Sequence, residues 1–281
     1  MDEFRKITAD AQNPFVLELG SHDGYHTNQM CKILNERRAT NWELVAFEPD
    51  KRILPKLQKA VSTWPENVII VSAAVGKKTG KTTIWLSGGE EKRPGYAKQR
   101  FTASSSIRQP NTVLQQWPDM TFERSQVDIV CLDYQIFEDR IIDFIWADIQ
   151  GAEIEMIQGG LDTLARTRYL YTEVGKDIYE GALDLPELVG ILPGEWQIMG
   201  FYDNEPLIRN NTLVIGDRLN LGVNQYHSGG ENPILTIMVL TLPQRAKMLT
   251  RLINRLMCQF RTSPNVELLI NQDNKTKTVG L

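Results

Sequence analysis

The segment Phe15–Gly24, with the sequence FVLELGSHDG, constrains the fold more than any other part of this 281-residue chain. Its first five residues are typical of a buried strand, and the strand runs into a turn that contains Gly20 and Gly24. A pattern typical of a helix follows the turn. A strand that leads through a glycine turn into a helix is the opening of a βαβ unit whose turn approaches a ligand. We therefore expect a parallel sheet whose first strand begins near Phe15.

Further strands and helices alternate over the first 220 residues. Apolar, β-branched runs predict strands at Phe15–Leu19, Leu44–Phe47, Val68–Ser72, Asp143–Ala147, Tyr169–Thr172 and Thr212–Ile215. An additional strand pair is predicted at Thr82–Leu86 and Val127–Leu132, and helices are predicted at Asn28–Arg38, Arg52–Ser62 and Ala152–Ala165. Strands that alternate with helices form parallel sheets, so the sequence predicts an α/β fold with a mostly parallel central sheet.

The chain is expected to consist of two parts joined by a linker. Residues 1–220 carry the alternating pattern, residues 221–233 are rich in glycine and polar side chains, and residues 234–281 begin a new pattern. From Asn232 onward there are seven basic and two acidic residues, which leaves 24 basic and 33 acidic residues before it. In the last part we predict a strand, a helix over Gln244–Phe260 and a second strand, which together form a short βαβ segment.

Composition and charge argue against several classes of protein. The acidic first part argues against nucleic acid as the main partner. No apolar stretch approaches the ~18 residues of a membrane helix, and the N-terminus lacks the apolar core of a secretion signal. The three histidines have no zinc-binding spacing. We expect a cytoplasmic protein without membrane insertion, with reduced thiols rather than a disulfide at Cys31, Cys131 and Cys258.

The glycine turn also limits the kind of ligand. A dinucleotide site of the GxGxxG type has its second glycine where this chain has His22, and a histidine side chain there would obstruct a pyrophosphate. S-adenosylmethionine has no pyrophosphate, so its methionine end can rest on the turn while Glu18 meets its ammonium group. A tight turn without any ligand is the alternative.

Acidic residues follow two further strands at the same end of the predicted sheet. Glu48, in AFEPD, lies where Rossmann-like folds bind ribose hydroxyls, and Pro49 stiffens the turn after it. A solvated glutamate is the alternative. Asp148 is expected to face the same crevice, although it could instead cap the helix that follows. Glu153 could act only on the dipole of that helix.

Together these motifs resemble the FkbM-type methyltransferase family over about Asn13–Ile215. The resemblance rests on LELGSHDGY, AFEPD, SAAVGKKTG, SSSI, VCLDY and, most distinctively, DIQGAEIEMIQGG followed by YLYTEV. It implies a Rossmann-like methyltransferase fold, S-adenosylmethionine as the donor, and methylation of a hydroxyl, often on a sugar. The sequence departs from the family at His22-Asp23 and at Gln150, and these departures concern the acceptor more than the donor.

The resemblance also implies roles for single residues. It puts Ala73 and Ala74 beside the adenine and makes Thr27 and Ser104–Ser106 candidates for the methionine carboxylate or the acceptor. The predicted donor site is Glu18, Gly20, Ser21, Gly24, Thr27, Glu48, Pro49, Ala73 and Ala74. The predicted acceptor site is Ser105, Ser106 and Glu153, with a solvated loop as the alternative for the serines. The polar segment Ser87–Ser106 is expected to be either a lid or a disordered insertion.

Methyl transfer to a hydroxyl requires alignment of the oxygen with the methyl group and a base that draws away the proton. Asp148 is the first candidate for this base, followed by His22, His26 and Glu173. A Mg²⁺ ion held by Asp148 and neighbouring acids is an alternative arrangement, although no metal-ligand motif indicates one.

Residues 234–281 resemble the opening of a family 2 glycosyltransferase of the GT-A type. The metal-binding Asp-x-Asp of such enzymes would follow Leu281, so we expect a chain cut from a longer bifunctional enzyme or a segment that docks on the first domain. A plain α/β extension is the alternative. The favoured function is a sugar or glycan O-methyltransferase. Two alternative functions are considered. One is a bifunctional glycan-biosynthesis protein whose main activity is glycosyl transfer, and the other is a non-catalytic Rossmann-like binding module.

Overall fold

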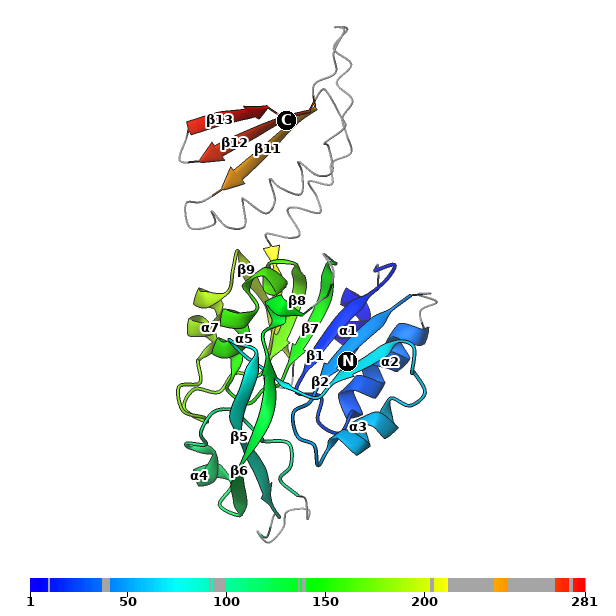
Figure 1. The fold of residues 1–281 in the computed structure, drawn as a ribbon, viewed down its shortest axis with the longest axis vertical. Helices are drawn as coiled ribbons and strands as arrows, with labels where there is room; N and C mark the ends of the chain where they lie inside the picture. The colour runs from blue at the N-terminus through cyan, green and yellow to red at the C-terminus, as the bar shows by residue number, and fades with distance from the viewer. Residues whose placement is uncertain are drawn as a thin grey trace, which may run out of the picture. The chain divides into compact units, whose positions relative to one another are not determined.

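The computed structural model describes residues 1–9, 11–36, 41–90, 92, 100–135, 137, 140–202 and 205–211, and three strands beyond them at 235–241, 266–272 and 275–280. The chain divides into two compact units, Met1–Leu219 and Asn220–Leu281, and each is described by itself. Figure 1 shows the elements of both.

The first unit is built on a seven-stranded sheet with the strand order β3-β2-β1-β7-β8-β10-β9. The first five strands in this order are parallel, and β10 is antiparallel to both β8 and β9. This confirms the predicted α/β fold with a mostly parallel central sheet. The bounds are β1 Phe15–Leu19, β2 Glu43–Phe47, β3 Val68–Val71, β7 Ile142–Ala147, β8 Thr167–Thr172, β9 Trp196–Tyr202 and β10 Glu205–Asn210.

The five parallel strands agree with the predicted ones to within two residues at each end. Parallel strands buried on both faces must be apolar nearly throughout, which makes them easy to recognise. The strand predicted at Thr212–Ile215 lies outside the described residues, and the sequence analysis missed β9 and β10. Strand β9 is largely exposed, and β10 includes Glu205 and Arg209, so neither has the apolar run of a central strand.

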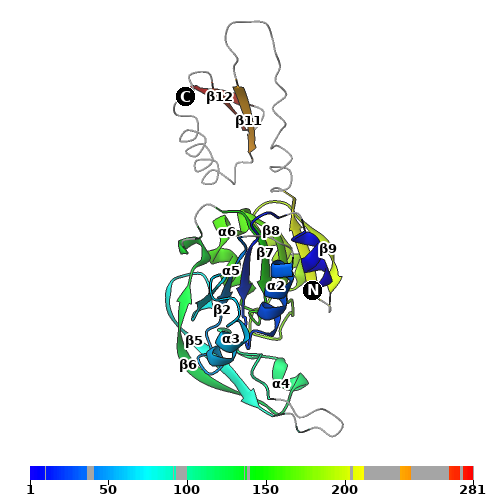
Figure 2. The same cartoon turned by 90° about the vertical axis from the view of Figure 1, so that its right-hand side faces the viewer.

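Helices cover both faces of the sheet, and alternate residues of one strand contact the helices of opposite faces. Helices α1 (Asp2–Ile7), α2 (Tyr25–Glu36) and α3 (Leu54–Ala60) pack on the face that carries Val16. Helices α5 (Glu153–Gly159), α6 (Leu161–Ala165) and α7 (Leu185–Ile191) pack on the face that carries Leu17 and Leu19. Neighbouring strand residues point to opposite faces, so one apolar strand supplies both cores. Figure 2 shows the N-terminal helix α1 beside β9, at the end of the sheet away from α3.

The helix predicted over Ala152–Ala165 is wrong as a single element. The structure has α5 at Glu153–Gly159 and α6 at Leu161–Ala165, separated at Gly160. A side chain at Gly159 would put its Cβ 2.1 Å from the Gly76 carbonyl oxygen, so the end of α5 packs directly on neighbouring backbone. Helix α7 (Leu185–Ile191), which begins with an Asp184–Glu187 capping box, was not predicted, nor was α1.

A second, three-stranded sheet has the order β4-β6-β5, with bounds β4 Ala74–Val75, β5 Gly80–Gly89 and β6 Met120–Val130. Strands β5 and β6 form the predicted strand pair, with Thr82 opposite Val127, although both are longer than predicted. Two short helical segments flank them, α4 at Val113–Gln116 and η1 at Leu132–Tyr134.

The polar segment Ser87–Ser106 therefore begins within β5. The backbone N–H of Ser106 donates to the Trp85 carbonyl at 3.1 Å, which anchors the end of the segment to that strand. Residues 91 and 93–99 lie outside the described residues, so whether this segment is a lid or a disordered insertion stays an open prediction.

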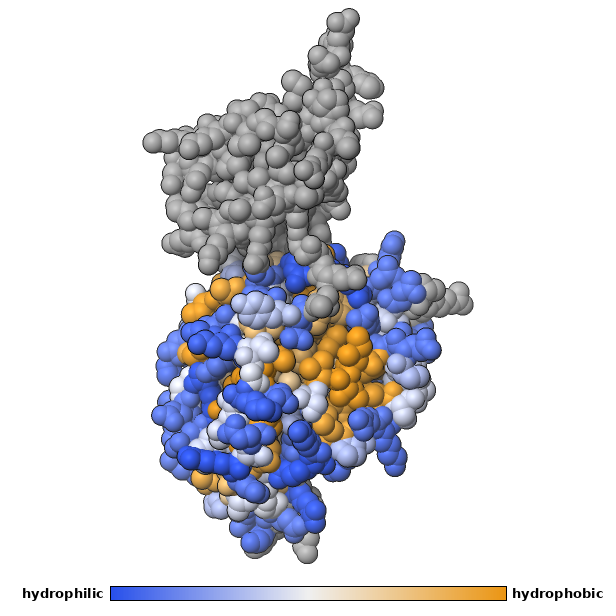
Figure 3. Space-filling model, viewed as in Figure 1, coloured by the Kyte–Doolittle hydropathy of each residue, from blue (hydrophilic) through white to orange (hydrophobic). Residues whose placement is uncertain are grey.

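Strand β3 is the edge of the large sheet, and its apolar side chains are partly uncovered. Ile69 is 52% exposed, and Val68, Ile70 and Val71 are half-buried. In Figure 3 a hydrophobic patch lies over the part of the first unit where Figure 1 shows β2 and its neighbour β3.

In the second unit, β11 (Leu235–Thr241) pairs in parallel with β12 (Val266–Gln272), which pairs antiparallel with β13 (Lys275–Gly280). The first two strands overlap the segments ILTIMVL and NVELLI, which are the two strands expected from the sequence, and β13 was not predicted. The helix predicted over Gln244–Phe260 lies outside the described residues. The linker at 221–233 and the identity of the 234–281 segment therefore stay predictions.

Within the part of the chain that the structure describes, no helix has the length and apolar character needed to cross a membrane. Cys31 and Cys131 are buried free thiols, and Cys258 lies outside the described residues.

Candidate active site

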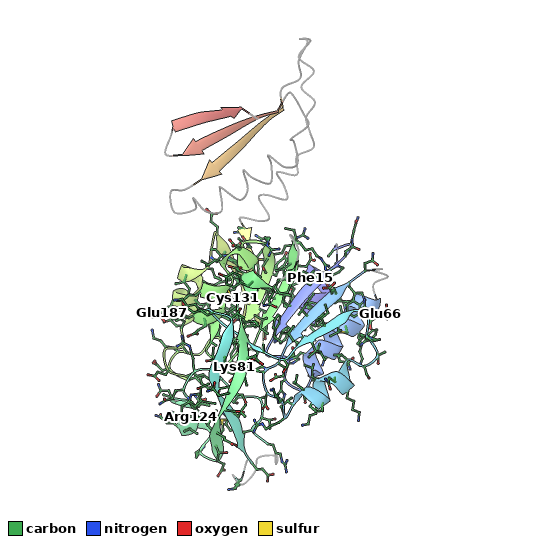
Figure 4. All side chains as sticks on the ribbon, viewed as in Figure 1. Phe15, Glu66, Lys81, Arg124, Cys131 and Glu187 are labelled. Atoms are coloured by element: carbon green, nitrogen blue, oxygen red, sulfur yellow. The ribbon has the colours of Figure 1, made fainter. Side chains whose placement is uncertain are left out.

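A cavity of about 260 Å³ lies at the carboxyl ends of β1, β2 and β7. Figure 4 labels Phe15, the first residue of β1, at the opposite end of the sheet, and Arg124 of β6 beyond the carboxyl ends. The predicted site residues that line the cavity are Gly20, Ser21, His22, Glu48, Pro49, Ala73, Ala74, Ser105, Ser106 and Asp148. Those that do not line it are Glu18, Gly24, Thr27, Glu153 and Glu173.

The two glycines of the turn, Gly20 and Gly24, are required for different contacts. Gly20 has a φ of +86°, and a Cβ there would lie 1.9 Å from the Asp148 carbonyl oxygen, so only glycine lets the ends of β1 and β7 approach. Gly24 has a φ of +82°, and a Cβ there would lie 2.8 Å from the Cβ of Ala60 in α3. Gly24 thus serves the packing of two helices, while Gly20 shapes the cavity wall.

Glu18 lies behind the turn rather than in the cavity wall. It is 1% exposed, and its carboxylate accepts a hydrogen bond from the Thr27 hydroxyl. Burial raises the pKa of Glu18 to about 8. Glu18 and Thr27 therefore form an internal pair that supports the turn, and contact of either with a donor remains a prediction.

Glu48 ties the glycine turn to the loop after β2. Its carboxylate accepts from the backbone N–H of His22 at 2.8 Å and from that of Asp50 at 2.7 Å. Burial raises the pKa of Glu48 to about 7. Sequence analysis missed the next link, in which Arg52 pairs with buried Asp50 at 2.6 Å and donates to the Ser87 carbonyl at 3.0 Å.

His22 occupies a backbone position that favours glycine, with a φ of +46°. Its Nε2 lies 3.0 Å from the Thr102 hydroxyl, which connects the turn to the segment before Ser106. Burial lowers the pKa of His22. The Ser106 hydroxyl in turn donates to the Gln150 carbonyl at 2.7 Å, so this segment closes one side of the cavity.

The side-chain amide of Gln150 joins two acids at the end of the sheet. Its Nε2 donates to the Asp148 carboxylate at 2.6 Å and to the Glu173 carboxylate. Its Oε1 accepts from the Tyr179 hydroxyl at 2.9 Å, which fixes the orientation of the amide. Burial, together with the nearby Asp148, raises the pKa of Glu173 to about 10.

These contacts revise two interpretations of the sequence. Asp148 does not cap the following helix, because Ala152 is the N-cap residue of α5 and no side-chain cap is present. Glu173 reaches the site through Gln150 and not by lining the cavity. Gln150 and Tyr179 were missed as site residues. The only signal for Gln150 was its place two residues after a strand-end acid, and the sequence had no signal for Tyr179.

Glu153 is buried in the first turn of α5, with 3% of its surface exposed. Burial raises its pKa to about 8, and its Oε1 has no hydrogen-bond partner among the described residues. Glu153 does not line the cavity, so its contact with an acceptor stays a prediction. In the same described part of the chain, no group of three or more His, Cys, Asp or Glu side chains is arranged to hold a metal ion.

The lining of the cavity thus combines two kinds of group. Ala73, Ala74 and Ile84 are apolar and suited to a flat ring, and Glu48 offers carboxylate oxygens to hydroxyl groups. Asp148 and His22, whose backbone N–H donates to Glu48, are groups that can accept a proton.

Comparisons with known proteins agree with this chemistry. Residues 18–201 match the family model described as the methyltransferase FkbM domain. The 2-O-methyltransferase NoeI of Sinorhizobium fredii (strain NBRC 101917 / NGR234) is 28% identical over 211 residues, which cover 72% of this chain and 81% of that protein.

Two solved structures are also similar at low identity. A SAM-dependent methyltransferase from Aquifex aeolicus has a TM-score of 0.40 and 12% identity, covering 74% of this chain and 86% of its own. Precorrin-6y C5,15-methyltransferase from Geobacter metallireducens GS-15 has a TM-score of 0.37 and 11% identity, covering 74% and 85%.

Proposed function

This chain belongs to the FkbM methyltransferase domain family, and from that premise we propose that it methylates a hydroxyl group of a sugar or glycan. Membership makes it a methyltransferase that uses S-adenosylmethionine. The name of its relative NoeI, a 2-O-methyltransferase, supports oxygen as the atom that is methylated. The observation that carries the proposal is Asp148, which lies at the cavity with its carboxylate held by Gln150.

The residues of the cavity fit the donor. S-adenosylmethionine supplies a methyl group bonded to a positively charged sulfur. The methyl group is transferred readily because the sulfur becomes neutral when that bond breaks. Each Glu48 carboxylate oxygen already accepts one backbone N–H and keeps a second lone pair, so both can accept from ribose hydroxyls. Ala73 and Ala74 would hold the adenine on the apolar wall, and Gly20 and Ser21 would hold the methionine end.

Asp148 is the proposed base. A hydroxyl becomes a competent nucleophile when its proton moves to a group within hydrogen-bonding reach. The Gln150 amide donates to one Asp148 oxygen and orients the carboxylate, which also hydrogen-bonds with Glu173. A carboxylate has about four lone-pair sites, so an acceptor hydroxyl can still donate to it. Glu173 is a poorer base, because with a pKa of about 10 it keeps its proton at neutral pH. His22 stays neutral there because burial lowers its pKa, and it is the second candidate.

Donor binding is tested by titrating the protein with S-adenosylhomocysteine and with NAD. We expect micromolar binding of the first and none of the second. Glu48→Ala should weaken S-adenosylhomocysteine binding by about 1–3 kcal/mol, because a charged hydrogen bond is lost. The exposed Glu66→Ala serves as the matched control. Equal affinity of the wild type and Glu48→Ala would remove Glu48 from the donor site.

We propose a second, separate candidate for the C-terminal unit, namely the start of a GT-A glycosyltransferase. Its support is the parallel pairing of β11 with β12, the arrangement that a βαβ unit requires. Titration of the whole chain with a UDP-sugar tests it. Absence of binding would leave the unit as a plain α/β extension.

A further inference from the structure

The ring of Tyr25 stands at the rim of the cavity proposed to hold the donor, called the donor cavity. Tyr25 is the first residue of α2, and it is 65% exposed. Among the large apolar and aromatic side chains that the described part of the chain exposes, it is the one that lines this cavity. Scattered exposed rings are normal on a protein surface, but a ring at the rim of a ligand cavity is placed to contact what enters it.

Tyr25 is held in this place by contacts of its backbone and of its ring. Its backbone N–H donates to the Asp23 carboxylate at 3.2 Å, which fixes the start of α2. The centroid of its ring lies 5.3 Å from that of the His26 ring, and the two planes meet at 65° in an edge-to-face contact. A ring that is already oriented loses little conformational entropy when a ligand covers it.

The start of α2 lies toward β7, the strand that leads to the proposed base. The centroid of the His26 ring is 4.7 Å from that of the Trp146 ring on β7. Asp148 follows β7, whereas Glu48, proposed for the ribose, follows β2, and these two strands lie on opposite sides of β1. Tyr25, the neighbour of His26, therefore borders the donor cavity together with Asp148 on the side of β7.

We propose that the Tyr25 ring binds the sugar that is methylated, by stacking on the apolar C–H face of its pyranose ring. This inference rests on the proposed function and adds the residue that recognises the acceptor. The electron-rich face of an aromatic ring attracts the C–H hydrogens of a sugar, and the tyrosine hydroxyl can bond to its hydroxyl groups. The sugar oxygen then takes the methyl group from the donor, its proton passes to Asp148, and the donor sulfur becomes a neutral thioether.

Stacking makes the shape of the acceptor decide its affinity. A pyranose is rigid and has an apolar face, whereas the alditol of the same sugar carries hydroxyl groups of the same kind on a flexible open chain. A hydrogen bond with the Tyr25 hydroxyl would be available to both compounds. Stacking is available only to the pyranose, so a preference for pyranosides over alditols should depend on the ring of Tyr25 and not on its hydroxyl.

The test measures sugar binding and methyl transfer separately, with the whole chain. Saturation-transfer difference nuclear magnetic resonance on the protein loaded with S-adenosylhomocysteine measures binding of neutral glycans, namely methyl glycosides and disaccharides of glucose, galactose and mannose, and of the corresponding alditols. Radiolabelled S-adenosylmethionine with the same compounds gives KM and kcat. Tyr25→Ala removes the ring and Tyr25→Phe retains it. Tyr134→Ala is the matched control, because Tyr134 is 77% exposed and does not line the donor cavity.

We expect the wild type to bind and methylate at least one pyranoside in preference to its alditol. Tyr25→Ala should lower the affinity for that pyranoside and raise its KM by about tenfold, and should lose the preference, because the stacking contact is gone. Tyr25→Phe and Tyr134→Ala should behave as the wild type does. The affinity for S-adenosylhomocysteine, measured by titration, should be the same in all four proteins.

An unchanged KM and affinity in Tyr25→Ala, an equal loss in Tyr25→Phe, or no preference of the wild type for pyranosides would overturn the inference. A matching loss of S-adenosylhomocysteine affinity in Tyr25→Ala would also overturn it, by making Tyr25 a donor ligand. Sugars labelled equally by the wild type and Tyr25→Ala would leave the proposed function intact. Pyranosides that bind through the Tyr25 ring but are not labelled would contradict the proposed function and retain the inference. Absence of both binding and label would contradict both.

Discussion

At the scale of single residues, Asp148 combines access to the donor cavity with a fixed orientation. Its carboxylate accepts from Gln150 at 2.6 Å, and its own backbone N–H extends the pairing of β7 with β1 by donating to Leu19 at 2.9 Å. Its place is therefore set by backbone pairing and its rotamer by a side-chain amide, which is the support that a reacting group needs.

Asp148→Asn should leave S-adenosylhomocysteine affinity within a few-fold and reduce turnover by about 10²–10⁴, the range for loss of a general base. Asparagine keeps the shape and an oxygen that accepts from Gln150. Titration and a methyl-transfer assay measure the two quantities. Equal loss of affinity and turnover would identify Asp148 as a donor ligand. Normal turnover would exclude Asp148 as the base and leave His22 and His26 as the candidates.

Gln150 is expected to position Asp148 and Glu173 rather than to react. Gln150→Leu should reduce turnover by about 10–100-fold through lost hydrogen bonds to carboxyl groups, with little change in donor affinity. Gln126→Leu, at an exposed glutamine of β6 that also donates one side-chain hydrogen bond, is the matched control. Turnover of Gln150→Leu equal to that of the wild type would reduce Gln150 to a structural role.

At the scale of elements, the ends of the strands place the site, and the segment before Ser106 closes it. From the sequence we predict that Ser87–Ser106 exchanges its amide hydrogens rapidly in the free protein and slowly with donor and acceptor bound. The structure narrows this prediction to the residues between the two ends of the segment. Ser87–Gly89 pair with β6 and the Ser106 amide donates to Trp85, so both ends should exchange slowly in both states and serve as an internal reference. Hydrogen exchange read by mass spectrometry measures this. Equally rapid exchange in the ternary complex would identify a plain insertion.

The parallel strands and the glycine turn could be predicted from the sequence because local composition determines them. Buried parallel strands are apolar throughout, and Gly20 stands where only glycine fits. The break at Gly160 could not be predicted, since it depends on how closely Gly159 approaches the loop at Gly76. The Gln150–Tyr179 contact likewise joins residues 29 apart in the sequence, and no local pattern specifies it.

At the scale of the whole molecule, the two units need not depend on each other for donor binding. Every residue assigned to the donor lies within Met1–Leu219, the first compact unit. A chain that ends at Asn220 should therefore bind S-adenosylhomocysteine with unchanged affinity. A folded truncated protein, judged by circular dichroism, that fails to bind would show that the second unit completes the site.

The buried acids should also make stability depend on pH. Burial raises the pKa of Glu18 and of Glu153 from 4.5 to about 8, so between these values the folded state holds more protons than the unfolded state. Their contribution to stability is present below about pH 4.5 and is lost as the pH rises to about 8. The Tm should fall over this window, and Glu153→Gln should flatten the fall. A slope unchanged by Glu153→Gln would show that Glu153 titrates normally.

The central claim, methyl transfer from S-adenosylmethionine to a sugar oxygen, is tested most directly by the position of the transferred group. The protein is incubated with donor labelled with ¹³C in its methyl group and with the glycans that bind, and the products are analysed by nuclear magnetic resonance. The account predicts a labelled methyl ether on a sugar carbon that carried a hydroxyl, formed by the wild type and lost in Asp148→Asn. A label on nitrogen or carbon, or equal labelling by Asp148→Asn, would contradict it.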